Sequence, residues 1–355
     1  MKHTRIFVKL TLLALCVCML LGLCACGETK SSQTTVMAMD TVMTLTAYGK
    51  NREAGLNAAV GIINSMDAML DPESPTSMVY AMNHANGENV VVSGQIAEMI
   101  TDVKQVYDQS GGELDITVYP LMKLWGFIDG KYYLPQPYEI MDTLTRRCFD
   151  DLVLTSFPSS GTYAVSMPGY GEVTFAAAAK GCTADKAIEA MRNAGVESGI
   201  ISLGGNVQTL GLKPDGSNWR VAIEDPNNTS SYLGVLSVGE TAVVTSGSYQ
   251  RYFTDVVTGG TYHHILTPST GYPVTNNLIS ATVICEDGTM ADCLSTALFV
   301  LGEIQSEAYW RQYGKTDGGG FEIILVTKDN RIICSSGLIE EFTLNNENYS
   351  LTFIE

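Results

Sequence analysis

Residues 290–302, Met-Ala-Asp-Cys-Leu-Ser-Thr-Ala-Leu-Phe-Val-Leu-Gly, form the stretch around which the rest of the chain is organised. Apolar residues recur in it at three- and four-residue intervals, which predicts a short helix with one buried face that ends at Gly302. Asp292 and Thr296 are four residues apart, so a helix directs their carboxylate and hydroxyl to the same side. Two such oxygen ligands suit Mg²⁺. The alternative is that Asp292 caps the helix and Thr296 bonds back to it.

Residues 1–25 have the pattern of a bacterial lipoprotein signal peptide. Three basic residues precede an apolar run from Leu10 to Leu23, which is shorter than the roughly 20 residues needed to cross a bilayer. A small residue then precedes Cys26, which we predict to be the lipidated first residue of the mature protein. The alternative is an uncleaved anchor helix. Either arrangement predicts an extracytoplasmic protein anchored to the bacterial cell membrane.

The rest of the chain is predicted to be one tethered folded unit. Residues 26–35 are polar and lack periodicity, so we expect a flexible tether there. Residues 36–355 remain for a large folded domain with a substantial core. Five cysteines at irregular spacing follow Cys26, and this spacing indicates neither a disulfide framework nor a zinc site. Of these, Cys285 and Cys334 could form a disulfide, which the sequence does not decide.

The charge of the chain argues against nucleic acid as a partner. The whole chain has a formal net charge of −17, and residues 1–25 contain three basic and no acidic residues, so the remainder is at −20. Such a surface repels phosphate backbones and anionic lipid headgroups. Contact with the membrane is therefore expected through the N-terminal lipid alone, and a polyanionic small ligand would need a metal ion or a local cradle.

Helical and strand-like patterns are mixed along the chain. Alternation of Thr and Val with other residues predicts one strand over residues 36–48, and residues 73–86 are typical of a polar loop. Helical spacing predicts helices at residues 56–70, 96–110 and 184–194. Further strands are expected at residues 199–203, 219–224, 242–246, 261–266, 279–285, 321–327 and 331–334, with a hairpin within residues 138–175. This mixture predicts an α+β fold with mixed, largely antiparallel sheets and packed helices.

Two glycine-containing motifs have features of ligand sites. Gly204-Gly205-Asn206 follows a predicted apolar strand, where backbone N–H groups could hold a phosphate, and an ordinary turn is the alternative. Ala176–Ala179 precede Lys180 and Gly181 at the entry to a helix, where small side chains would let a ligand or an ion reach main-chain oxygens. The alternative there is a close-packed helix crossing with a solvated lysine.

His263 and His264 are adjacent on a predicted strand, so their side chains point to opposite faces and only one can join a given site. This arrangement argues against a zinc pair. A Ser-His-Asp hydrolase built from Ser246, His264 and Asp292 is an alternative, but the chain lacks the G-x-S-x-G turn that such enzymes use for the nucleophile.

Taken together, these stretches resemble the ApbE family of flavin transferases, the FAD:protein FMN transferases. The resemblance runs from about Met39 to Leu325 and rests on many separate motifs in one order. The motifs are Met39 and Thr41, Ser77 to Asn83, Leu114-Asp115 with Leu124-Trp125-Gly126-Phe127, Ala179-Lys180-Gly181 with Asp185, Leu203-Gly204-Gly205-Asn206, Thr245-Ser246-Gly247-Ser248-Tyr249 with Arg251 and Phe253, His264-Ile265-Leu266 with Pro268, Thr270, Gly271 and Pro273, and Ala291-Asp292 with Ser295-Thr296-Ala297.

The resemblance implies a T-fold-related architecture and a phosphotransferase-type enzyme that uses FAD and Mg²⁺. Such an enzyme moves the FMN half of FAD onto a Thr or Ser hydroxyl of an exported flavoprotein and releases AMP. The resemblance implies metal ligands in the side chains of Asp292, Ser295 and Thr296 and the backbone oxygen of Ala177. It implies FAD contacts at Met39, Glu73, Leu114, Asp115, Lys180, His264 and Leu266. Two departures from the family pattern are Thr174, where many members have an acidic or amide residue, and Thr267, where many have Asp.

The chemistry of this reaction suits the same residues. When an alcohol breaks a pyrophosphate, the phosphate charge must be neutralised and a base must take the proton of the alcohol. We expect Asp292 to act through Mg²⁺, with Lys180 and His264 as donors to the pyrophosphate, and either Asp292 or Asp115 as the base. Two other functions remain open, an FAD pyrophosphatase that releases free FMN and AMP, and a non-catalytic flavin-binding lipoprotein.

Overall fold

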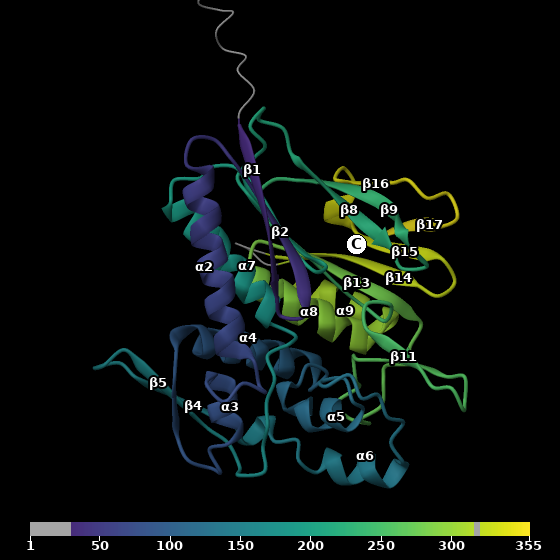
Figure 1. Ribbon diagram of the computed structural model, residues 1–355. Helices are drawn as coiled ribbons and strands as arrows, with labels where there is room; N and C mark the ends of the chain where they lie inside the picture. The colour runs from purple at the N-terminus through teal and green to yellow at the C-terminus, as the bar shows by residue number, and fades with distance from the viewer. Residues whose placement is uncertain (1–29, 316–319) are drawn as a thin grey trace, which may run out of the picture.

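The predicted helix that carries Asp292 is α8 (Gly288–Leu301), which packs against the centre of a nine-stranded sheet (Figure 1). The computed structural model describes residues 30–315 and 320–355. The strand order of the large sheet is β1-β2-β6-β7-β10-β13-β14-β15-β17, and its neighbours are antiparallel except for β15 and β17. This arrangement confirms the predicted α+β class.

The strands of the large sheet are β1 (Ser31–Ala38), β2 (Thr41–Tyr48), β6 (Gly199–Leu203), β7 (Asn206–Leu210), β10 (Ala242–Gly247), β13 (Leu278–Cys285), β14 (Glu322–Thr327), β15 (Arg331–Ser335) and β17 (Ser350–Ile354). Smaller sheets contain β16 (Phe342–Leu344), β9 (Asn228–Val238) and β8 (Trp219–Asp225); β3 (Val90–Val92), β5 (Thr162–Ser166) and β4 (Val153–Phe157); and β11 (Tyr252–Thr254) with β12 (Thr261–His263). The other helices are α2 (Arg52–Leu70), α3 (Met78–Asn83), α4 (Gly94–Ser110), α5 (Tyr119–Leu124), α6 (Pro137–Leu144), α7 (Ala179–Asn193) and α9 (Glu303–Tyr313), and the 3₁₀ helices are η2 (Ile116–Val118), η3 (Phe149–Asp151) and η4 (Ser336–Leu338).

The large sheet is covered on both faces (Figure 1). Val244 of β10 belongs to the same apolar cluster as Leu294 of α8. The preceding residue, Val243, belongs to a second cluster with Trp219 and Leu236 of the β16-β9-β8 sheet. Successive side chains of a strand point to opposite faces, which explains why the central strands are apolar at consecutive positions. Helices α2 and α7 cover β2 and β6 in a third cluster.

The expected single strand over residues 36–48 is instead a hairpin of β1 and β2. Ala38 pairs with Thr41, so Met39 and Asp40 form a two-residue turn, and both have positive φ angles, 49° and 58°. The pairing extends back to Ser31, so the predicted flexible tether is wrong for residues 31–35. A polar Ser-, Gln- and Thr-rich segment can form an edge strand because the partner strand supplies its hydrogen bonds. The predicted signal peptide and Cys26 lie outside the described residues.

Other differences concern helix ends and cysteines. The expected loop over residues 73–86 contains α3, which begins where the Ser77 hydroxyl accepts the Tyr80 N–H. Helix α8 begins at Gly288 and is capped by Asp287, so the alternative in which Asp292 is the cap is wrong. The five cysteines among the described residues are free thiols, which excludes a Cys285–Cys334 disulfide in this structure.

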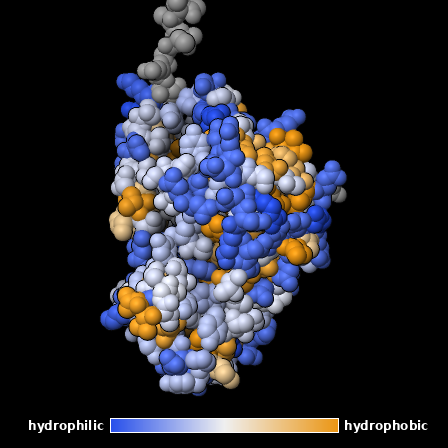
Figure 2. Space-filling view, turned by 90° about the vertical axis from the view of Figure 1, so that its right-hand side faces the viewer, coloured by the Kyte–Doolittle hydropathy of each residue, from blue (hydrophilic) through white to orange (hydrophobic). Residues whose placement is uncertain are grey.

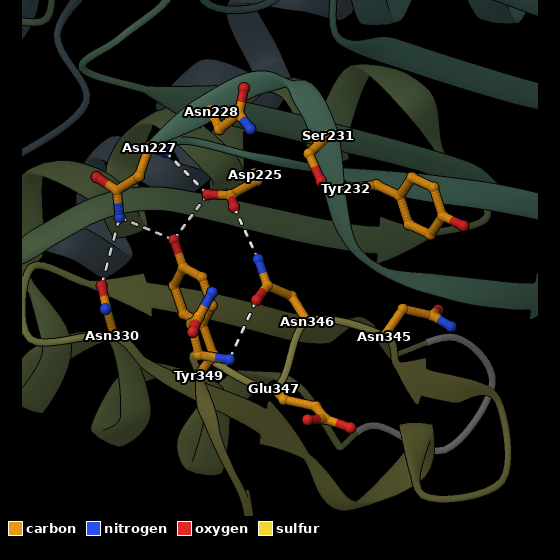
Figure 3. A pocket seen from close by; sticks show the side chains of 11 residues that line it. Asp225, Asn227, Asn228, Ser231, Tyr232, Asn330, Asn345, Asn346, Glu347 and Tyr349 are labelled. Atoms are coloured by element: carbon orange, nitrogen blue, oxygen red, sulfur yellow. Dashed lines mark hydrogen bonds between the residues drawn. The ribbon is translucent and has the colours of Figure 1, made fainter.

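A hydrophilic hollow of about 800 Å³ lies on the β8–β9 side, between the β8–β9 turn and the segment before β17. Figure 3 shows Tyr349 between Asp225 and Asn227. The Tyr349 hydroxyl donates to buried Asp225 at 2.7 Å and accepts from Asn227 at 2.8 Å, and Asn346 donates to the other Asp225 oxygen at 2.9 Å. This network ties the C-terminal segment to the small sheet, and we assign it a structural role.

The surface seen in Figure 2 is mainly hydrophilic. Figure 2 shows hydrophilic side chains over most of one face, with apolar side chains in separate groups between them. Within residues 30–315 and 320–355, every helix is too short or too polar to cross a membrane.

Candidate active site

The residues predicted to act together line two adjoining pockets, which form one cleft. An inner cavity of about 100 Å³ lies beside α8, and a more open pocket of about 570 Å³ lies beside the β1–β2 turn. Lys180 and His264 line both pockets, so they stand where the two meet. The cleft is therefore continuous from the predicted metal ligands to the strained turn of the N-terminal hairpin.

Most of the predicted site residues line this cleft. The inner cavity is lined by Leu114, Asp115, Ala177, Leu266, Asp292 and Thr296. The outer pocket is lined by Met39 and Glu73. The exception is Ser295, which is fully buried behind the wall, where its hydroxyl bonds to Ser246 and to the backbone oxygen of Asp292 at 2.8 and 3.0 Å.

Asp292 is held by the start of α7. Its side chain is buried, and its Oδ2 accepts the Gly181 N–H at 2.9 Å. In a regular helix this N–H would donate to the carbonyl of Ala177, four residues earlier. Because it donates to Asp292, the Ala177 carbonyl receives no hydrogen bond from any described residue and is open to a ligand. Lys180 Nζ lies 3.7 Å from Asp292 Oδ1.

Glycine is required where α7 and α8 meet. A Cβ atom on Gly181 would lie 2.1 Å from the Gly288 backbone oxygen and 2.9 Å from the Asp292 Cβ. Asp185 reinforces this crossing, since its carboxylate accepts the N–H groups of Gly288 and Thr289 at the start of α8 at 2.9 and 2.8 Å. The negative charge is favourable there because helix N-termini carry unpaired N–H groups and a partial positive charge. The crossing thus fixes the position of Asp292.

Hydroxyl groups lie beside the Asp292 carboxylate at the inner cavity. The Thr296 hydroxyl lines the inner cavity one turn after Asp292, and it pairs with the Ser246 hydroxyl at 3.2 Å. The i, i+4 spacing read from the sequence therefore does place a carboxylate and a hydroxyl on the same side of α8.

Asp115 is occupied by structural bonds. Its Oδ1 accepts the backbone N–H and the hydroxyl of Thr117 at 2.7 and 2.6 Å, and its Oδ2 accepts from Arg147 Nε at 2.8 Å. Both carboxylate oxygens of Asp115 are therefore already engaged by protein donors. The geometry does not support the expectation that Asp115 could take a proton, and Asp115 instead fixes the segment that carries Leu114.

His264 presents a neutral ring whose Nε2 can accept a hydrogen bond. Its Nδ1 lies 3.1 Å from the Arg251 backbone oxygen, and burial lowers its pKa to about 3. The ring is therefore neutral at pH 7, and because a carbonyl only accepts, Nδ1 carries the hydrogen and Nε2 has a lone pair. The geometry thus argues against the expectation that His264 donates to a pyrophosphate. Strand β12 ends at His263, so His264 lies just beyond the predicted strand, and the two rings contact different segments, with His263 Nε2 donating to the Val274 oxygen at 2.9 Å.

The outer pocket is held by contacts that the sequence did not reveal. The Tyr119 hydroxyl donates to the Glu73 carboxylate, and burial together with this bond raises the pKa of Tyr119. Asp67 accepts the Met39 N–H at 2.8 Å. Thr174, one of the two departures from the family pattern, lines both pockets, and its Oγ1 accepts the Ala176 N–H at 3.3 Å. The Tyr119–Glu73 and Asp67–Met39 partners lie far apart in sequence, and local periodicity gives no signal for them.

Comparison with known proteins decides the family. The family model described as "ApbE family" matches residues 39–318 of this chain. The chain belongs to the ApbE family. Among its ApbE relatives, a Treponema pallidum (strain Nichols) protein named FAD:protein FMN transferase is 28% identical over 96% of both chains. A Klebsiella pneumoniae (strain 342) protein of the same name is 32% identical over 80% of this chain and 85% of its own.

Solved ApbE structures share the fold. The ApbE protein of Thermotoga maritima has a TM-score of 0.78 and 26% sequence identity, with coverage of 87% of this chain and 98% of its own. The apo form of the Pseudomonas stutzeri flavinyl transferase ApbE has a TM-score of 0.73 and 26% identity, with coverage of 85% and 93%. The comparison therefore extends over both the helical layer and the sheets.

Proposed function

We propose that this chain transfers the FMN moiety of FAD onto a Thr or Ser hydroxyl of an acceptor protein and releases AMP. The observation that carries the proposal is the group of oxygen atoms from Asp292, Thr296 and Ala177 at the inner end of a cleft, in a chain of the ApbE family. Its ApbE relatives are named for this transfer. The outer pocket offers the room that a dinucleotide needs beyond its pyrophosphate.

The residues present fit Mg²⁺. Among the described residues, no group of three or more His, Cys, Asp and Glu side chains could hold a metal, which argues against zinc. One buried carboxylate, one hydroxyl and one open carbonyl are hard oxygen ligands, and Mg²⁺ fills its remaining positions with water and phosphate oxygens. We infer that Asp292, Thr296 and the Ala177 oxygen would hold the ion. When bound, Mg²⁺ supplies neutralisation of the phosphate charge.

The protein groups supply charge and a proton acceptor. The Lys180 ammonium lies at the junction of the two pockets, where it can bind a pyrophosphate oxygen. His264 Nε2 carries a lone pair and faces the cleft where the two pockets meet, so it is the group in position to accept the proton of the acceptor hydroxyl. The hydroxyl oxygen forms a bond to the FMN phosphorus, the bond to the bridging oxygen breaks, and AMP leaves with that oxygen.

The test follows AMP, free FMN and protein-bound flavin. The full-length chain is incubated with FAD and Mg²⁺, with and without an acceptor protein. The proposal expects AMP and fluorescent acceptor in equal amounts. AMP with free FMN and no labelled protein would indicate the pyrophosphatase, and FAD binding without AMP would indicate a flavin-binding lipoprotein.

A matched pair of variants tests the oxygen group. Asp292→Asn keeps an oxygen for the Gly181 N–H but removes the charge, so transfer should fall steeply and respond to higher Mg²⁺ concentration. Asp287→Ala removes an acidic side chain from the same helix, outside the cleft, so the rate should be kept while the helix loses its cap. Equal transfer rates for Asp292→Asn and the wild type would show that α8 does not contribute to the active site.

We further propose that the chain is exported and anchored through a lipid on Cys26, so that its acceptor is an exported flavoprotein. The basic start, the short apolar run and the small residue before Cys26 support this. Cys26→Ser should abolish incorporation of labelled fatty acid and release the protein from membranes. Cys24→Ser, two residues earlier, should keep both. Covalent lipid on the Cys26→Ser protein would show that the proposed cleavage site is misplaced.

A further inference from the structure

The turn between β1 and β2 is strained. It has two residues, Met39 and Asp40, and both lie in the left-handed region of backbone space. Two-residue hairpin turns of this kind favour Asn-Gly or Asp-Gly, because a side chain with a Cβ atom disfavours positive φ. Met is a poor residue for such a position. Strain of this kind persists only where the surrounding structure holds the backbone in place, and it is common at ligand sites.

The strongest contact that holds the turn comes from α2. The Asp67 Oδ1 accepts the Met39 N–H at 2.8 Å, across 28 residues of sequence. An ionised acceptor makes this bond stronger than a neutral one. Arg251 lies 3.9 Å from Asp40, but the Asp40 side chain is 86% exposed, so solvent screens this pair.

The other side of the turn is closed by the Gly204-Gly205 turn after β6. A Cβ atom on Gly204 would lie 2.3 Å from the Thr41 hydroxyl oxygen, so Thr41 packs directly against the glycine backbone. The Thr183 hydroxyl of α7 also contacts the Met39 sulfur at 3.8 Å. The turn is thus clamped between Gly204 and Asp67, and among the described residues Asp67 alone supplies a charged group to its backbone.

The clamped turn forms one wall of the cleft. Met39, Asp40 and Asp67 line the same outer pocket as Lys180 and His264. A turn held before the ligand arrives costs less ordering entropy on binding, which raises affinity without any change at the reacting atoms. A turn free to relax would lose this preorganisation.

We propose that Asp67 is a positioning residue for the flavin nucleotide, because its carboxylate holds the Met39-Asp40 turn in the conformation that forms the wall of the cleft. Asp67 acts through the backbone of Met39 and does not take part in the phosphoryl transfer. This inference rests on the proposed function, since FAD is the ligand for which the wall is preorganised.

The first measurement is the affinity for FAD, which needs no turnover. In the full-length Asp67→Ala protein, the Kd for FAD from flavin fluorescence should rise roughly tenfold or more, as expected when a charge-assisted hydrogen bond is lost. The KM for FAD should rise in parallel while kcat changes less. Asp67→Asn keeps an oxygen acceptor of the same shape, so its Kd should lie between those of the wild type and Asp67→Ala.

The decisive experiment is a rescue. Asp40→Gly gives one of the two turn positions a residue that tolerates positive φ, so the turn should depend less on Asp67. The loss of FAD affinity caused by Asp67→Ala should therefore be clearly smaller in the Asp40→Gly background than in the wild-type background. If Asp67→Ala weakens FAD binding by the same factor in both backgrounds, Asp67 acts by another route and the proposal is wrong. Wild-type affinity in Asp67→Ala would overturn it as well.

A control separates this effect from general damage to the hairpin. Glu53 is a carboxylate at the start of α2 that bonds to Ser32 at the far end of the same hairpin. Glu53→Ala should leave the Kd for FAD unchanged, and equal weakening in Glu53→Ala and Asp67→Ala would contradict a role specific to the turn. Because Kd is measured without turnover, a failure of FMN transfer in the wild-type protein would reject the proposed function and leave the affinity pattern to be judged separately.

Discussion

Gly181→Ala tests whether the crossing of α7 and α8 positions Asp292. The added Cβ atom would lie 2.1 Å from the Gly288 backbone oxygen, whereas real Cβ atoms essentially never approach closer than 3.0 Å. The two helix starts must therefore separate by about 1 Å. The same methyl group would press on the Asp292 Cβ at 2.9 Å, and it threatens the bond from the Gly181 N–H to the Asp292 carboxylate.

Gly181→Ala is expected to lower both the stability and the reaction rate. Overpacking of this kind destabilises by about 1–3 kcal/mol, which corresponds to a fall of several degrees in Tm. Misplacement of a reacting group by about 1 Å costs roughly 100-fold in rate. We therefore expect AMP release at saturating FAD and Mg²⁺ to fall about 100-fold, beyond what partial unfolding at the assay temperature explains. Thermal unfolding and initial rates measured on the same preparation separate these two effects.

Gly61→Ala is the matched control. Gly61 lies in α2, and a Cβ atom there would meet nothing within 4 Å. Because Ala favours the helix over Gly, this variant should be as stable as the wild type or up to about 1 kcal/mol more stable, with an unchanged rate. The reasoning is refuted if Gly181→Ala keeps the wild-type rate, even if its Tm falls, because the crossing would then be packing without a role in positioning Asp292.

Three further predictions concern stability. Burial lowers the pKa of His264 from 6.5 to about 3, so protons favour the unfolded chain and stability should decline as pH falls from 6.5 toward 3. His264→Gln should flatten this decline in urea midpoints measured from pH 7 to 4. Parallel profiles for the variant and the wild type would contradict the burial argument. Arg147→Ala should cost about 3 kcal/mol in urea unfolding because it leaves the buried Asp115 carboxylate without its charged partner, and adding Asp115→Asn should recover part of the loss. Tyr349→Phe should cost about 1–2 kcal/mol by removing the bond to Asp225 while the Kd for FAD stays the same, and a weaker Kd would connect this hollow to the cleft.

The sequence by itself determined the features that follow from local geometry. Helical spacing placed Asp292 and Thr296 on one side of a helix, and the structure has both on the wall of the inner cavity. The prediction that only one of His263 and His264 joins the site agrees with the structure, where their ring nitrogens bond to the backbone of different segments, although the strand ends at His263. These predictions hold because the 3.6-residue period of a helix and the two-residue period of a strand are properties of the backbone.

Only the tertiary structure decided features that depend on partners distant in sequence. Residues 31–48 form a hairpin through a turn at Met39 that the sequence does not signal. The Met39 N–H donates to Asp67 on helix α2. Folding brings Arg147 to Asp115 and so engages both of its carboxylate oxygens, and the residues packed around His264 lower the pKa of its ring. Such burial and pairing join residues that are distant along the chain, and neither leaves a periodic pattern in the amino-acid sequence.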